Sequence, residues 1–284
     1  MPDPTPSAPP PPSPLPNVKS VIAVGAGKGG VGKSTVAALF AMGLARKGRQ
    51  VGLLDGDVYG PSLPKITGSE DARPEVDEEG FIVPAEKHGI RMLSMGYLVR
   101  PEQAVIWRGP LAQKYLKEML ERGRWGELDV LIVDLPPGTG DIPLTLAQSI
   151  ALTGAVIVCT PQDLALADAV KALRMFQTLG VEPLGFVENM SYHVCPQCGH
   201  RDEIFGHGGA EQAARNLGVP FLGGIPLNTA IRVNGDSGTL LENFTATEPY
   251  VAQALEETVD RLIEQLEAAR KKHGTPLPQL NPGH

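Results

Sequence analysis

A glycine-rich stretch directly after an apolar run constrains this chain more than any other feature. Residues 27–34, GKGGVGKS, follow SVIAVG and match G-x-x-x-x-G-K-[ST] in the order strand, loop and helix. The glycines let such a loop wrap with its backbone N–H groups pointing at phosphate oxygens, and the positive end of the next helix strengthens the attraction. The pattern predicts a nucleotide site whose binding residues are Gly27, Lys28, Gly29, Gly30, Val31, Gly32, Lys33, Ser34 and Thr35.

Three polar side chains near this loop have specific expected roles. Lys33 should reach the β- and γ-phosphates, and the Ser34 hydroxyl should bind Mg²⁺. Asp134 ends the apolar run VLIVD, and a carboxylate at the carboxyl end of a strand beside the phosphate loop suits the Mg²⁺ shell. Thr35 either faces the α-phosphate or simply starts the helix.

Seven apolar runs predict the strands of the fold, namely SVIAVG, QVGLLD, IRMLSM, DVLIVD, AVIVCT, LGFVEN and FLGGIP. Their apolar residues are continuous rather than alternating, which is typical of strands covered on both faces. Helical periodicity between several of them, as at residues 34–46 and 166–179, predicts βαβ crossovers. Residues 250–272 carry an apolar stripe that we expect to pack on the sheet. The predicted fold class is α/β, with a doubly wound, mostly parallel sheet flanked by helices.

Composition limits the compartment and the partners that we expect. The net charge of −7 disfavours nucleic acid and anionic membranes, and no stretch approaches the roughly 20 apolar residues of a membrane span. Three cysteines in 284 residues cannot form a disulfide framework, which indicates a reducing cytoplasm. Residues 1–17 and 273–284 are rich in proline and are predicted to be flexible tails on either side of one ATPase domain at residues 18–272.

The segment VCPQCGH holds two of the three cysteines. Cys195 and Cys198 form a Cys-x-x-Cys pair in a loop near residues 190–208, whereas structural zinc or a cubane iron-sulfur cluster takes four ligands. The pair is therefore half of a metal site, or else a redox dithiol. Further ligands of a zinc site within one chain would come from His193, His200 or His207. Cys159, inside AVIVCT, is expected to be an inert core residue.

A second lysine inside the loop, Lys28, resembles the deviant Walker A motif of the MinD/ParA/ArsA group of ATPases. In that group the lysine reaches across a dimer to the partner's phosphates, so the resemblance implies a homodimer in which Lys28 is catalytic together with Lys33; a solvated lysine is the alternative. The resemblance also implies that Asp57 positions the attacking water and that Asp55 joins the Mg²⁺ shell. Either aspartate could instead cap the next turn.

The same ATPase group places an adenine-contacting asparagine where this chain has Asn189 in the segment FVENMS. The resemblance therefore implies that Asn189 contacts the base. An Asn-Lys-x-Asp guanine reader is absent from the sequence, which favours ATP over GTP.

Eight motifs follow one another along the chain: GKGGVGKST, GLLDGDVYGPSLP, WRGP, DLPPGTGDIPLTL, TPQDLALADAV, ENMSYHVCPQCG, IFGHGGA and FLGGIPLNTAIR. Together they resemble the Mrp/ApbC family of iron-sulfur cluster carrier ATPases over residues 17–243. The resemblance implies that Cys195 and Cys198 of two subunits hold one bridging [4Fe-4S] cluster. It also implies slow ATP hydrolysis coupled to loading or release of that cluster, with cluster-assembly factors and apo iron-sulfur proteins as partners.

Two positions qualify the resemblance. Asn228 stands where family members commonly have aspartate, which puts a nucleotide contact there in doubt. Arg108 in WRGP is the nearest candidate for an arginine finger, and a role in a salt bridge is an alternative of at least equal weight. A ParA/MinD-type positioning ATPase and a zinc-stapled regulatory ATPase are the two rival functions.

Overall fold

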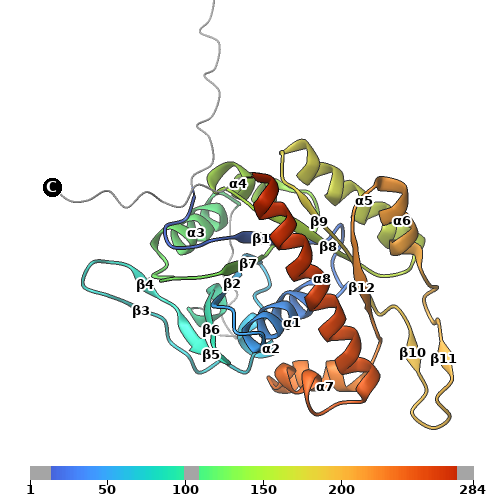
Figure 1. Cartoon of the computed structure of the whole chain (residues 1–284). Coiled ribbons are helices and arrows are strands. Elements are labelled where there is room, and N and C mark those ends of the chain that lie inside the picture. The colour runs from blue at the N-terminus through green and yellow to red at the C-terminus, as the bar shows by residue number, and fades with distance from the viewer. Residues whose placement is uncertain (1–13, 99–108, 274–284) are drawn as a thin grey trace, which may run out of the picture.

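An eight-stranded sheet forms the centre of the protein. The computed structural model describes residues 14–98 and 109–273, and the strand order is β12-β9-β8-β1-β7-β2-β6-β5 (Figure 1). Every neighbouring pair in this sheet is parallel except β5 and β6. The strands are β1 (Val21–Gly25), β2 (Val51–Asp55), β5 (Ala85–Lys87), β6 (Ile90–Ser94), β7 (Val130–Asp134), β8 (Gly154–Cys159), β9 (Pro183–Asn189) and β12 (Phe221–Ile225).

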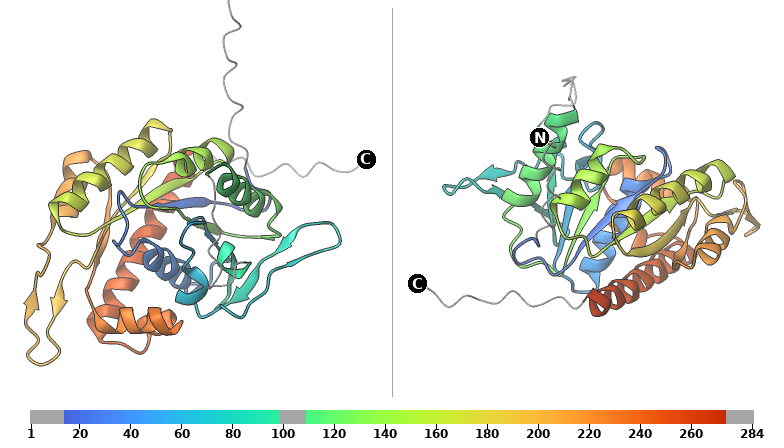
Figure 2. Two further views of the ribbon diagram at one scale, coloured as in Figure 1. Left: turned by 180° about the vertical axis from the view of Figure 1, so that it is seen from behind. Right: turned by 90° about the horizontal axis from the view of Figure 1, so that it is seen from above.

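Helices cover both faces of this sheet, so the apolar core has two halves (Figures 1 and 2). Successive strand residues point to opposite faces: Ile22 and Val24 lie in the half beneath α1 and α8, whereas Val21 and Ala23 lie in the half beneath α3 to α6. The helices are α1 (Lys33–Arg46), α3 (Gly109–Arg122), α4 (Asp141–Ser149), α5 (Asp163–Thr178), α6 (Gly209–Leu217) and α8 (Pro249–His273).

Short elements connect and extend these layers. They are the helices α2 (Leu63–Ile66), η1 (Met95–Tyr97), α7 (Thr229–Ser237) and η2 (Leu240–Phe244) and the strands β3 (Glu75–Val76), β4 (Ile82–Val83), β10 (His193–Val194) and β11 (Arg201–Asp202). The β3/β4 and β10/β11 hairpins project beyond opposite edges of the sheet (Figures 1 and 2).

The doubly wound, mostly parallel sheet is confirmed, and the seven apolar runs correspond to β1, β2, β6, β7, β8, β9 and β12. The apolar stripe of α8 packs into the core, as expected, through Val251, Leu255, Val259, Leu262 and Leu266. The sequence did not reveal β5 or the two hairpins. These strands are short and mostly exposed, so no buried apolar run marks them.

Most of the two predicted tails lies outside the described residues. Leu15 differs from the expectation for residues 1–17, because it is buried in the core half that contains α3. Near it, the Lys19 N–H donates to the Leu128 carbonyl oxygen at 3.0 Å. Across residues 14–98 and 109–273, the helices are too short or too polar to cross a membrane.

Candidate nucleotide and cysteine sites

The phosphate loop lies at the carboxyl edge of the sheet, between β1 and α1. Its last glycine, Gly32, precedes α1 with a φ of 80°, in the left-handed region that glycine adopts without strain. Asp55 and Asp134 align in the register of β2 and β7, and β7 also pairs with β1. The fold therefore brings both carboxylates to the edge where the phosphate loop begins, as the sequence predicted.

A buried ion pair lies at the centre of this site. The Lys33 ammonium donates to Asp134 Oδ1 at 2.5 Å and to Ser34 Oγ at 3.2 Å. Burial raises the pKa of Asp134, and the charge of Lys33 opposes that rise. The other carboxylate oxygen, Asp134 Oδ2, is buried without a hydrogen-bond partner among the described residues. Carboxylate and hydroxyl oxygens are ligands that Mg²⁺ accepts, so Asp134 and Ser34 fit the expected metal shell.

Asp55 is fully buried and organises the loop that follows β2. Its carboxylate accepts hydrogen bonds from the backbone N–H groups of Asp57, Ser62 and Leu63 at 3.1–3.2 Å and from Ser94 Oγ at 2.9 Å. Burial and then the charge of Asp134 raise the pKa of Asp55 to about 7. Four protein donors already use this carboxylate. Three of them are backbone N–H groups of the following loop, which agrees with the capping role that the sequence left open for Asp55.

Asp57 lies half-buried in the same loop. Burial raises the pKa of its carboxyl, and the charge of Lys33 and the backbone N–H groups of Gly60 and Tyr59 lower it. The negative charge of Asp57 also contributes, as the smallest cause, to the raised pKa of Asp134. Asp57 therefore shares the electrostatic environment of the Lys33 and Asp134 pair.

Two close approaches hold the phosphate loop against the end of β9 and against α5. The Asn189 side-chain amide donates to the Val31 carbonyl oxygen at 2.9 Å, so the residue predicted to read the base also supports the loop. A Cβ added at Gly27 would lie 2.1 Å from the backbone carbonyl carbon of Asp168 in α5. Gly27 is thus required for the close packing of the loop on α5.

We expect Gly27→Ala to lower the free energy of unfolding by about 2 kcal/mol, because the added methyl overlaps a backbone that cannot rotate away. Gly29→Ala is the matched control in the same loop, since its Cβ would meet its nearest neighbour, Pro137, at 3.9 Å. Denaturant unfolding of the two variants measures the difference. Equal stability of Gly27→Ala and the wild type would show that α5 does not restrain the loop.

Lys28 is half-buried and makes no ion pair or side-chain hydrogen bond within the described ranges. The Lys33 ammonium, in contrast, is committed to Asp134 and Ser34. The two lysines of one loop are therefore in different environments, and Lys28 has no charged partner among the described residues.

The cysteine pair lies in the tight turn of the β10/β11 hairpin. The Cys195 N–H donates to the His200 carbonyl oxygen, and the Gly199 N–H donates to the Cys195 carbonyl oxygen, both at 2.9 Å. Cys195 is half-buried and Cys198 is exposed. Backbone N–H groups of Cys198 and Gln197, and then the Cys198 side chain, lower the pKa of the Cys195 thiol. A lowered pKa favours the thiolate, the form that ligates metals.

The histidines do not complete a metal site within one chain. His193 Nδ1 lies 3.1 Å from the Leu227 carbonyl oxygen, and His207 lies 3.9 Å from a Glu203 carboxylate oxygen. Three or more metal-ligating side chains do not gather anywhere in the part of the chain that the structure describes. The geometry therefore gives the zinc hypothesis only the two cysteines. Cys159 is buried on β8, and burial raises the pKa of its thiol, as expected of a core residue.

Asn228 has a structural role at the start of α7. Its Oδ1 accepts the Ala230 N–H at 2.7 Å and so caps α7, while its Nδ2 donates to the Tyr250 hydroxyl at 2.7 Å. The substitution for aspartate is compatible with the cap, because both side chains are good N-caps. Arg108 lies outside the described residues.

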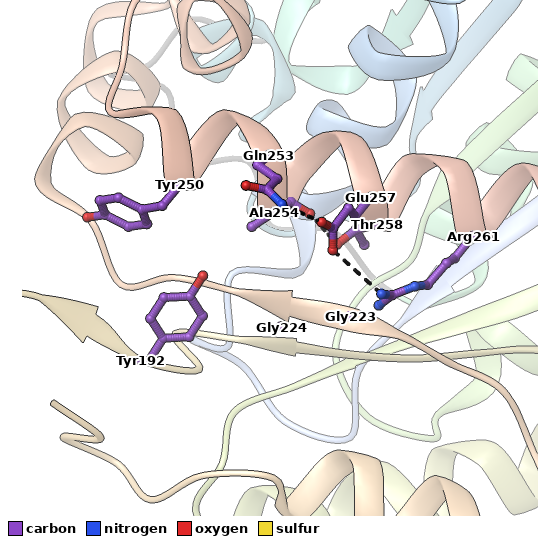
Figure 3. A pocket seen from close by; sticks show the side chains of 9 residues that line it. All are labelled: Tyr192, Gly223, Gly224, Tyr250, Gln253, Ala254, Glu257, Thr258 and Arg261. Carbon is purple, nitrogen blue, oxygen red and sulfur yellow. Dashed lines mark hydrogen bonds and ion pairs between the residues drawn. The ribbon is translucent and has the colours of Figure 1, made fainter. Parts of the chain in front are cut away.

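A groove of about 210 Å³ lies between β12 and α8, next to the cysteine hairpin (Figure 3). Its wall includes Tyr192, and the Arg201 guanidinium of β11 stacks on that ring at 3.8 Å. Polar side chains of the groove contact one another: the Gln253 amide donates to Glu257 at 2.8 Å, and the Arg261 guanidinium lies 3.5 Å from the same carboxylate. The groove thus holds a glutamate with two polar partners, and the Arg201 contact ties β11 to its wall.

Fold and site together define a P-loop nucleotide-binding protein with a hairpin that carries two free cysteines in a Cys-x-x-Cys pair. Residues 17–263 match the family described as ParA, NUBPL iron-transfer P-loop NTPase, and the chain belongs to this family. The family resemblance drawn from the motifs is therefore confirmed.

Curated relatives match most of this chain. The iron-sulfur cluster carrier protein of Salmonella typhimurium is 48% identical over 249 residues, which are 88% of this chain and 67% of the relative. Its counterpart in Escherichia coli K12 is 51% identical over 222 residues, 78% of this chain and 60% of the relative. The iron-sulfur cluster transfer protein NUBPL of Dictyostelium discoideum is 46% identical over 253 residues, which are 88% of this chain and 77% of the relative. The chain thus spans about two thirds of the length of these bacterial relatives.

Two solved structures place the fold. A nucleotide-binding protein from Archaeoglobus fulgidus in complex with ADP is 42% identical, with a TM-score of 0.71 over 80% of this chain and 89% of the other. The cell division ATPase MinD of Pyrococcus furiosus is 23% identical, with a TM-score of 0.63 over 87% and 99%. The second likeness concerns the fold alone.

Proposed function

We propose that this protein is an ATP-dependent carrier of a [4Fe-4S] cluster, which two copies of the chain hold between them and pass to apo iron-sulfur proteins. Cluster-assembly factors would load it. The names of the bacterial and Dictyostelium relatives support the cargo, and the ADP-bound Archaeoglobus relative supports the nucleotide.

The observation that carries the proposal is the incomplete ligand set of the cysteine hairpin. Cys195 and Cys198 supply two thiolates, and the described residues provide no third ligand nearby. A [4Fe-4S] cluster takes four thiolates, which a second copy of the hairpin would supply by symmetry. Exposed apolar side chains of Ile204 and Phe205 lie in the same segment and offer surface to that copy.

The nucleotide half of the proposal uses the buried charges at the carboxyl edge of the sheet. Lys33 would bind the β- and γ-phosphates, and Ser34 and Asp134 would hold Mg²⁺, with Asp55 supporting the shell. When bound, Mg²⁺ neutralises charge on the phosphates. Lys28, which is without an ion-pair partner among the described residues, would reach the phosphates of the second subunit. Asp57 would orient the attacking water.

Asp57→Asn tests the last assignment. The amide keeps the shape of the carboxylate and removes its charge, so we expect phosphate release to fall by about a hundredfold. Binding of ATP should stay within about threefold of wild type, because Asp57 acts on the water and leaves the phosphate contacts in place. Steady-state phosphate release and equilibrium titration with a fluorescent ATP analogue measure the two effects. Wild-type turnover would exclude Asp57 from catalysis.

Cluster transfer to an apo ferredoxin tests the function as a whole. Protein loaded with iron and sulfide without oxygen is mixed with the apo acceptor in the presence of an iron chelator, with and without ATP. Direct transfer predicts that the acceptor gains its cluster although the chelator captures free iron. If the chelator takes all the iron and the acceptor stays empty, the protein releases iron and does not carry a cluster.

A further inference from the structure

One buried carboxylate ties both ends of the cysteine segment, residues 191–210, to the sheet. Glu188, the penultimate residue of β9, is completely buried. Its Oε1 accepts hydrogen bonds from Ser191 Oγ at 2.6 Å and from the Gly208 N–H at 3.3 Å. Its Oε2 accepts the Ala210 N–H at 2.9 Å. Ser191 lies where the chain leaves β9 for the hairpin, and Gly208 and Ala210 lie where it returns to form α6.

The chain leaves β9 through an uncommon backbone conformation. Met190, between Asn189 and Ser191, has a φ of 55°, in the left-handed region that residues other than glycine rarely adopt. The hydrogen bond between Ser191 and Glu188 spans this residue and closes the turn. The direction in which the hairpin leaves the sheet is thus fixed by the carboxylate of Glu188.

The next residue of the same strand touches the phosphate loop. Asn189 Nδ2 donates to the Val31 carbonyl oxygen at 2.9 Å, and a Cβ added at Gly32 would lie only 2.2 Å from that nitrogen. Because successive side chains of a strand point to opposite faces, Glu188 and Asn189 connect the end of β9 to structures on its two sides. A shift of the phosphate loop would therefore move the strand end to which the cysteine hairpin is fastened.

We propose that Glu188 is the positioning residue that makes the cysteine hairpin respond to the nucleotide state of the phosphate loop. This inference rests on the proposed function, in which ATP controls the cluster. It assigns Glu188 no contact with nucleotide or cluster. Its partners are the two ends of the cysteine segment, and its effect on the loop passes through Asn189.

Glu188→Gln disrupts the three hydrogen bonds of the carboxylate, called the clamp below, with little change in side-chain volume. Three donors converge on the carboxylate, and a glutamine amide would turn its own N–H groups toward at least one of them. Glu203→Gln is the matched control, because Glu203 lies exposed on the same segment. Ser191→Ala is a second variant that removes one arm of the clamp and leaves the backbone intact.

The experiment measures maleimide labelling of Cys195 and Cys198 in cluster-free, full-length protein with ATP, with ADP and without nucleotide. We expect the labelling rate of the wild type and of Glu203→Gln to change by about fivefold or more between nucleotide states. In Glu188→Gln this change should shrink to less than about twofold, and in Ser191→Ala to an intermediate value. ATP affinity should be unchanged in all of them.

The full wild-type response in Glu188→Gln would overturn the inference, as would a wild type without any response or an equal loss in Glu203→Gln. If Glu188→Gln does not fold, Ser191→Ala decides: a full response in that variant overturns the inference, and a reduced one supports it. The assay contains no iron, so failure of the protein to hold a cluster leaves its outcome unaffected. The two proposals therefore fail separately.

Discussion

Replacement of Lys33 by alanine should lower ATP turnover by at least about a hundredfold, because the ammonium that stabilises charge on the β- and γ-phosphates is removed. The iron content of the reconstituted protein should not change, since Lys33 lies in α1 and the cysteines lie in the β10/β11 hairpin. Phosphate release and iron analysis of the same preparation measure both effects. Unchanged turnover would remove Lys33 from the catalytic site.

The buried environment of Lys33 requires a control for stability. Alanine leaves the fully buried Asp134 without its cation, and loss of one partner of a buried pair costs about 3–5 kcal/mol unless the carboxyl takes up a proton. The double variant Lys33→Ala/Asp134→Asn removes that uncompensated charge and should unfold at higher denaturant than Lys33→Ala alone. Because Asp134 is itself a proposed Mg²⁺ ligand, the double variant is a control for stability alone. Low turnover of Lys33→Ala, measured at a temperature where its circular dichroism shows it to be folded, shows that the loss is catalytic and does not come from unfolding.

Replacement of Cys195 by alanine should remove at least about nine tenths of the iron and sulfide, because a cubane cluster needs all four thiolates. Cys159→Ala is the matched control, since Cys159 is buried in β8, and it should keep its full iron content. Iron and acid-labile sulfide are measured after anaerobic reconstitution and desalting. A full cluster in Cys195→Ala would contradict the assignment of the ligands.

Mixed dimers separate a shared site from a site within each chain. A chain with both Cys195→Ala and Cys198→Ala is co-expressed with the wild-type chain, each with its own affinity tag, and the mixed dimer is isolated with ATP. A cluster that bridges the subunits predicts almost no iron in the mixed dimer, because only two thiolates remain. A site complete within one chain predicts about half of the wild-type iron.

The sequence predicted the sheet and the phosphate site because continuous apolar strands and the glycine pattern are local signals. Lys33 and Asp134 meet at one sheet edge, as the strand that ends in Asp134 indicated. Asp55, which the family resemblance implied for the same site, aligns with Asp134 in the strand register. The polar partners could not be predicted in the same way. Ser94 and Ser62, which bind Asp55, come from other segments of the chain, and only the folded register places them within reach.

The hairpin that carries the cysteines was recognised as a loop, although its short strands were not. Two-residue strands without a fully buried side chain give no periodic signal. The role of Glu188 could not be predicted for a related reason, since a single acidic residue in the run LGFVEN indicates only the end of a strand. Its role depends on Gly208 and Ala210, which lie 20 and 22 residues further along the chain and which the fold brings back to Glu188.

Metal analysis of protein purified without oxygen tests the central claim most directly. The proposed carrier predicts about two irons and two sulfides per chain, that is, one four-iron cluster per dimer, with little zinc. One zinc per chain without sulfide would contradict the account. The cysteine hairpin would then be a structural zinc element, and ATP would control something other than an iron-sulfur cluster.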